Sequence, residues 1–114
     1  MLRLKAGCEA ADEGAVRATL GPAATVTIDD GEHPDAQSAV RGSEAVTGTL
    51  LRLFADVPDL TVTEQSVNGE SGLVFRGGGR VVGVLTARLA ADRIRELWIV
   101  VNPDKLRHWN APES

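Results

Sequence analysis

The chain has 114 residues, a length that suits one domain and leaves no room for two. Its net charge of −4 argues against nucleic acid as a direct partner, because phosphate contacts need a basic face. The single cysteine excludes an internal disulfide, and the aliphatic runs are too short to span a membrane. We therefore expect one cytoplasmic domain over residues 1–114.

The first third of the chain predicts two helices, a strand and a loop. Apolar residues at helical spacing indicate a helix over residues 2–11, and Asp12 then reads as the N-cap of a second, shorter helix. Residues 23–28 contain β-branched side chains and predict a short strand. Residues 29–38 are polar and contain glycine and proline, so we expect a loop there.

The clearest helix covers residues 43–56, with Ser43 as its expected N-cap. Its apolar residues form one stripe, which must face a core. From Leu60 onward the apolar period changes to two, which indicates strands. Short turns, such as Asn68-Gly69, join these strands into an antiparallel meander. The predicted strands cover about 60–67, 71–76, 81–89 and 94–101.

The last predicted strand is apolar on both faces. Trp98 and Val100 point to one face, and the other carries Leu97, Ile99 and Val101. A sheet with one face in water would alternate apolar with polar residues. The helices can cover one side, so we expect a second copy of the chain on the other, which predicts a homodimer through the sheet. The alternative is that the chain's own tail covers this strand.

The order of predicted elements is that of the SnoaL-like/NTF2-like fold, an α+β cone in which a curved antiparallel sheet wraps around three helices. The C-terminal half is more specific. It runs from Val67-Asn68-Gly69 to Asn102-Pro103-Asp104-Lys105-Leu106. This half resembles the SnoaL-like C-terminal extension of one group of bacterial extracytoplasmic-function RNA polymerase sigma factors. The family's glycine-rich loop with its lysine corresponds here to Asp30-Gly31-Glu32-His33-Pro34, which is shorter and lacks the lysine.

The resemblance implies regulation by binding rather than catalysis. In that family the extension contacts the DNA- and polymerase-binding regions of the sigma factor, partly through its C-terminal tail. The expected contact with sigma-factor regions or RNA polymerase therefore lies at the start of the tail over 102–114, in Asn102, Pro103, Asp104, Lys105 and Leu106. A purely structural interpretation is that Asn102-Pro103 ends the last strand, because proline cannot donate to the ladder.

Two other functions stay open. NTF2-like pockets also host isomerases, polyketide cyclases and hydrolases, which need a carboxylate or histidine in a dry pocket. His33 and Asp35 are the candidates, although a solvated loop is the plainer interpretation. A carrier of a small apolar ligand is the third function, and Phe54, Arg88 and Trp98 are the residues expected to line a ligand pocket. No metal site or cofactor is predicted, because the histidines are far apart and the cysteine has no partner at ligand spacing.

Overall fold

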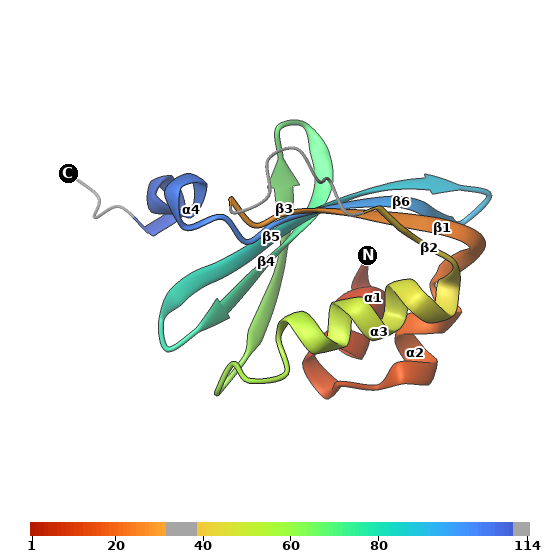
Figure 1. Ribbon diagram of the computed structural model, residues 1–114, viewed down its shortest axis with the longest axis horizontal. Coiled ribbons are helices and arrows are strands. Elements are labelled where there is room, and N and C mark those ends of the chain that lie inside the picture. The colour runs from red at the N-terminus through yellow and green to blue at the C-terminus, as the bar shows by residue number, and fades with distance from the viewer. Residues whose placement is uncertain (32–38, 111–114) are drawn as a thin grey trace.

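The computed structural model describes residues 1–31 and 39–110 (Figure 1). Three helices lie on one side of a curved six-stranded sheet, and a fourth packs against the other side. The helices are α1 (Leu2–Ala10), α2 (Glu13–Ala18), α3 (Ser43–Leu53) and α4 (Pro103–Asn110). The strands are β1 (Leu20–Asp29), β2 (Ala39–Arg41), β3 (Thr61–Val67), β4 (Glu70–Gly77), β5 (Arg80–Ala90) and β6 (Arg93–Val100).

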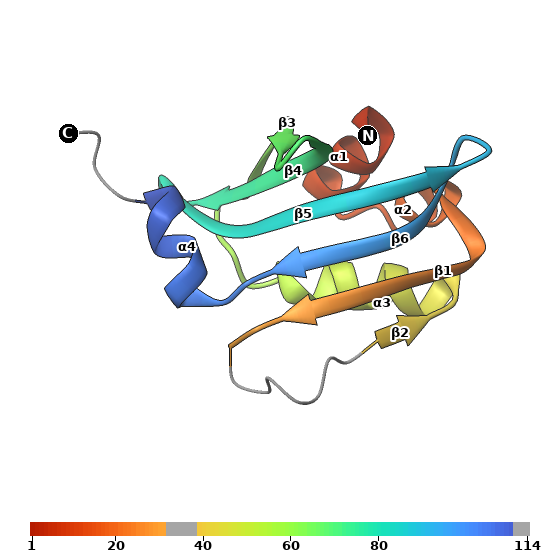
Figure 2. The same cartoon turned by 90° about the horizontal axis from the view of Figure 1, so that it is seen from above.

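The sheet has the order β2-β1-β6-β5-β4-β3 (Figure 2). The meander from β3 to β6 confirms the four strands expected from the two-residue period. Asn68 and Gly69 have φ of 52° and 80°, as a two-residue hairpin of this kind requires. Strand β1 pairs in parallel with β6, so the sheet is mixed rather than wholly antiparallel. The three-residue strand β2 was not expected, since it is short and lies next to a polar segment.

Asp12 is the N-cap of α2, as its position in the sequence predicts. Its Oδ1 accepts a hydrogen bond from the backbone N–H of Ala15 at 3.1 Å. We expect Asp12→Ala to lower the free energy of unfolding by about 1 kcal/mol, because it leaves this N–H without its partner. Urea denaturation would measure the change. Asp12→Asn keeps an acceptor oxygen and should stay close to wild type, so an equal loss in both variants would contradict the capping role.

The expected N-cap at Ser43 is wrong by one residue. Gly42 occupies the cap position with φ of 103°, a conformation that favours glycine, and Ser43 begins α3. The helix ends at Leu53, earlier than expected, because Phe54 leaves the helical conformation to enter the turn before Pro58.

The inner face of the sheet packs on the three N-terminal helices. Phe75 of β4 is fully buried there, and its ring stacks on Phe54 with the centroids 4.2 Å apart. Gly83 of β5 permits this approach, since a Cβ atom there would lie 2.9 Å from the Phe54 ring. Val46 and Leu50 bring the predicted stripe of α3 into the same core. The chain's own side chains therefore fill much of the interior of the cone.

The outer face of the sheet carries a second apolar cluster, which α4 covers. Leu106 of α4 is only 5% exposed, and it packs among valines that include Val84 and Val100. Helix α4 is an element that the sequence pattern did not indicate. It supplies for Val100 the cover that was expected from a second copy, whereas Trp98 on the same face stays half-buried outside this cluster.

Candidate functional site

The segment from Asn102 to Leu106 starts α4. Asn102 acts as its N-cap, since its Oδ1 accepts from the N–H of Asp104 at 3.0 Å and its carbonyl accepts from the N–H of Leu106 at 3.0 Å. Pro103 takes the first helical position, where a missing N–H costs nothing. The residues that end the last strand therefore also begin a helix, so the two interpretations of Asn102-Pro103 are not exclusive.

A single carboxylate ties the start of α4 to the end of β1. Asp29 accepts a hydrogen bond from Asn102 Nδ2 at 3.3 Å and forms an ion pair with Lys105. The hydrogen bond from Lys105 is the main reason why the pKa of Asp29 is lowered. Gly31 packs against the same side chain, since a Cβ atom there would lie only 2.7 Å from Asn102 Cγ. The fold thus brings the end of β1 against the Asn-Pro-Asp-Lys-Leu segment, which is a feature of the family resemblance.

The far end of α4 is held by an amide side chain. Asn110 Oδ1 accepts from the N–H of Val81 at 2.7 Å, and Asn110 Nδ2 donates to the carbonyl of Val81 at 3.0 Å. Strand β5 runs on past its last pairing with β6, between Val84 and Val100. The carboxamide therefore occupies a stretch of β5 edge that β6 does not reach. Asp29 and Asn110 were both missed by sequence reasoning, because nothing near them in the sequence marks their partners.

The side of α4 that faces away from the sheet is polar and exposed. Pro103 and Asp104 lie on it, and Arg107 Nη2 is 3.5 Å from Asp104 Oδ1. Trp109 is 36% exposed. Of the five predicted contact residues, Asn102, Lys105 and Leu106 are thus engaged within the chain. The other two remain accessible to a partner.

We expect the docking of α4 to depend on pH through Asp29. A lowered pKa means that its stabilising contribution is present above the ordinary pKa of an aspartate, about 3.9, and is lost as the pH falls through the folded value. The protection factors of the amides over residues 103–110, which correct for the intrinsic slowing of exchange at low pH, should therefore be smaller at pH 3 than at pH 6. Asp29→Asn should show weaker protection already at pH 6. Equal protection of both proteins at pH 6 would contradict this role.

The three residues expected to line a ligand pocket do not line one pocket, although Arg88 and Trp98 contact each other. Phe54 lies in the inner core, whereas Arg88 and Trp98 lie on the outer face of the sheet. The guanidinium carbon of Arg88 is 5.2 Å from the centroid of a Trp98 ring, and Arg88 Nε is 3.7 Å from Glu70. His33 and Asp35, the candidates for catalysis, lie outside the described residues.

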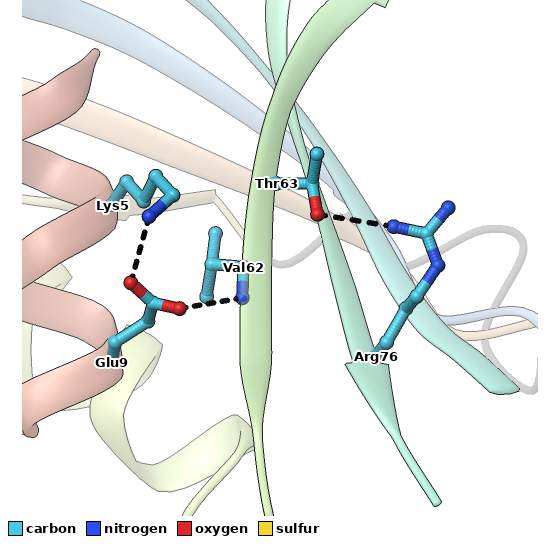
Figure 3. A network of polar contacts seen from close by, with 5 residues as sticks. All are labelled: Lys5, Glu9, Val62, Thr63 and Arg76. Atoms are coloured by element: carbon cyan, nitrogen blue, oxygen red, sulfur yellow. Dashed lines mark hydrogen bonds and ion pairs between the residues drawn. The ribbon is translucent and has the colours of Figure 1, made fainter. Parts of the chain in front are cut away.

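A hollow of about 370 Å³ opens between α1 and α3, beside Phe54. Burial raises the pKa of its Cys8 thiol to about 12, so the thiol stays protonated at neutral pH. The pKa of Glu9 is lowered, chiefly by the hydrogen bond from Lys5 at 2.9 Å and then by the N–H of Val62 at 3.1 Å (Figure 3). Neither group therefore has the near-neutral pKa of a proton-transfer catalyst.

Residues 1–31 and 39–110 contain no group of three His, Cys, Asp or Glu side chains that could hold a metal ion. No helix within the same ranges combines the length and apolar character needed to cross a membrane.

No family model and no curated protein matches the sequence. Among solved structures, the chain is similar to the Mycobacterium tuberculosis extracytoplasmic function sigma factor SigJ, with a TM-score of 0.65 and 30% identity. That match covers 90% of this chain and 41% of SigJ, so the chain spans less than half the length of that sigma factor.

Two proposed polyketide cyclases are also similar. One, SnoaL-like and from Jannaschia sp. CCS1, has a TM-score of 0.65 and 21% identity over 98% of this chain and 90% of its own. The other is IdmH from Streptomyces antibioticus, with a TM-score of 0.65 and 22% identity over 97% and 95%. The chain therefore has a SnoaL-like, NTF2-like fold, and the resemblance inferred from its sequence is confirmed.

Proposed function

We propose that this chain is a non-catalytic SnoaL-like domain that binds and regulates an extracytoplasmic-function sigma factor. The observation that supports this proposal most directly is the position of α4 on the sheet. This helix is fastened to the sheet through Leu106 and Asn110, and it presents Asp104 and Arg107 to solvent in a defined geometry. The 30% identity with SigJ over 90% of this chain adds support, because the two polyketide cyclases named above share only 21% and 22% identity with it.

The interior supports binding over catalysis. Among the described residues, Thr47 is the one buried polar side chain, and its hydroxyl donates to the carbonyl of Ser43 at 2.7 Å within α3. The ionisable groups of the hollow beside Phe54 include Cys8 and Glu9, whose pKa values are moved away from neutrality. An enzyme of this fold would need a proton-transfer group elsewhere.

The test is binding to a SigJ fragment that lacks the region similar to this chain, measured by isothermal titration calorimetry. The double variant Asp104→Arg/Arg107→Asp reverses two exposed charges on α4 and should weaken binding at least 10-fold. Glu44→Arg, at an exposed position on α3, is the control and should bind like wild type. Absence of binding by wild type would overturn the regulatory proposal, and equal binding by the α4 variant would overturn the role of α4.

The hollow beside Phe54 supports a second candidate, a carrier of a small apolar ligand, since ligand pockets start at about 300 Å³. Titration with the uncharged fluorophore N-phenyl-1-naphthylamine would test it. Binding should be saturable in wild type and lost in Leu51→Trp, which places a larger side chain at the lining of the hollow. Unsaturable fluorescence, or equal binding by both proteins, would contradict this candidate.

The outer face beyond α4 supports the proposal of a homodimer through the sheet. Trp98 is half-buried there, Thr86 lies opposite it on β5, and the charged pair Arg88 and Glu96 lies in the next row. Across a two-fold axis, Arg88 of one copy can lie opposite Glu96 of the other copy, which would place opposite charges together. Sedimentation equilibrium should give a dimer mass for wild type and a monomer mass for Thr86→Glu. A monomer mass for wild type would refute the pairing.

A further inference from the structure

Two of the most exposed large apolar side chains in the described part of the chain lie in the same place. Leu2 is 69% exposed and Leu89 is 50% exposed. They lie far apart in the sequence, yet both line one hollow of about 540 Å³, which also takes residues from β3 and the β5–β6 turn. We call this the α1–β5 hollow. Its apolar lining consists of Met1, Leu2, Leu4, Ala18, Leu89 and Ile94.

Core residues also line the hollow. Leu4 and Ile94 are at most 3% exposed and belong to the core at the base of the hollow. Leu89 pairs with Ile94 just past a register shift in the β5–β6 ladder, and it lies at the hairpin end of β5. Burial of apolar surface is favourable, so a partner that covers both side chains would gain a large part of its affinity there. Exposed apolar groups that gather in a concave place are typical of interaction sites.

Charges at the rim suggest the chemistry of the partner. Glu64 of β3 and Asp92 of the β5–β6 turn line the hollow with their acidic side chains, and Arg3 is the one basic residue among the lining residues. Glu64 and Asp92 are both exposed, so a basic side chain can reach them from solvent. An apolar floor with a mainly acidic rim is complementary to an apolar side chain next to a lysine or arginine.

We propose that the α1–β5 hollow binds a segment of a partner protein that carries aliphatic or aromatic side chains beside a Lys or Arg. The inference rests on the proposed function, in that the partner is taken to be the sigma factor. It adds a second contact surface, separate from α4, for which neither the family resemblance nor the predicted contact residues gave an indication.

The first experiment uses the SigJ fragment described above and the double variant Leu2→Asp/Leu89→Asp. Both positions are exposed, so the variant should fold with an unchanged circular dichroism spectrum. We expect at least a 10-fold weaker Kd. The control, Thr63→Asp/Ala45→Asp, adds the same charge at exposed positions outside the hollow and should bind like wild type. Equal binding by wild type and the leucine variant would overturn the inference, as would a loss of self-association alone.

A second experiment separates this inference from the proposed function. The full chain, labelled with nitrogen-15, is titrated with a short peptide of alternating leucine and lysine, and with a matched peptide of leucine and glutamate. Amide shifts at Leu2, Leu89 and Asp92 are expected with the lysine peptide only. If the SigJ fragment fails to bind but these shifts appear, the sigma-factor partner is wrong and the site stands. If both peptides leave these amides unshifted, or both shift them equally, the site is wrong.

Discussion

Phe75→Ala is expected to lower the free energy of unfolding by about 3–5 kcal/mol, the range for a buried phenylalanine. Phe75 is 0% exposed, and its removal also takes away the stacking partner of Phe54. The space left lies on the inner face of the sheet, where the surrounding strands can collapse only in part. Urea denaturation, followed by the fluorescence of the two tryptophans, would measure the loss.

Leu89→Ala is a suitable control for this change, since an exposed leucine should shift the free energy of unfolding by no more than about 0.5 kcal/mol. A loss below about 1 kcal/mol for Phe75→Ala would mean that the aromatic pair is not a packed core. The interior of the cone would then be an open ligand cavity, and the case for binding through the surface of the domain would weaken.

Leu106→Ala is expected to have the second largest effect, a loss of about 2–3 kcal/mol, at the lower end of the range for buried leucine. Leu106 is the one buried side chain of α4, so its truncation should release the helix from the valine cluster. Because α4 lies at the end of the described chain, we expect local detachment before the sheet unfolds. Amide exchange over residues 103–110 should therefore accelerate more than exchange in β5.

Arg107→Ala is the matched control, because this side chain is 78% exposed on the other side of the same helix. It should leave exchange in α4 nearly unchanged. Uniform acceleration over the whole protein in Leu106→Ala would show that α4 unfolds only together with the sheet. The helix would then be a fixed part of the core rather than a separately docked element.

Local patterns in the sequence were sufficient to predict most of the strands and turns of the C-terminal half. The two-residue period, together with turns such as Asn68-Gly69, predicts β3 to β6, because hairpin partners are neighbours in the chain and turn geometry sets their register. The cap at Asp12 follows from one side chain and the N–H groups next to it. The apolar stripe of α3 likewise indicates which of its faces is buried.

Contacts between distant segments could not be predicted in this way. Three such contacts join residues that share no local pattern. They are the parallel pairing of β1 with β6, the contacts of Asp29 with Asn102 and Lys105, and the hydrogen bonds between Asn110 and Val81. The meeting of Leu2 and Leu89 at one hollow is of the same kind.

The sequence by itself determined the class of fold, the helices of the inner layer and the need for cover on both faces of the last strand. Only the tertiary structure decided what covers Val100 on the outer face. A short helix with one buried leucine carries a weak pattern of its own, and its position depends on a carboxylate and a strand edge that the chain brings there from elsewhere. The surface left for a partner is therefore a property of the assembled fold.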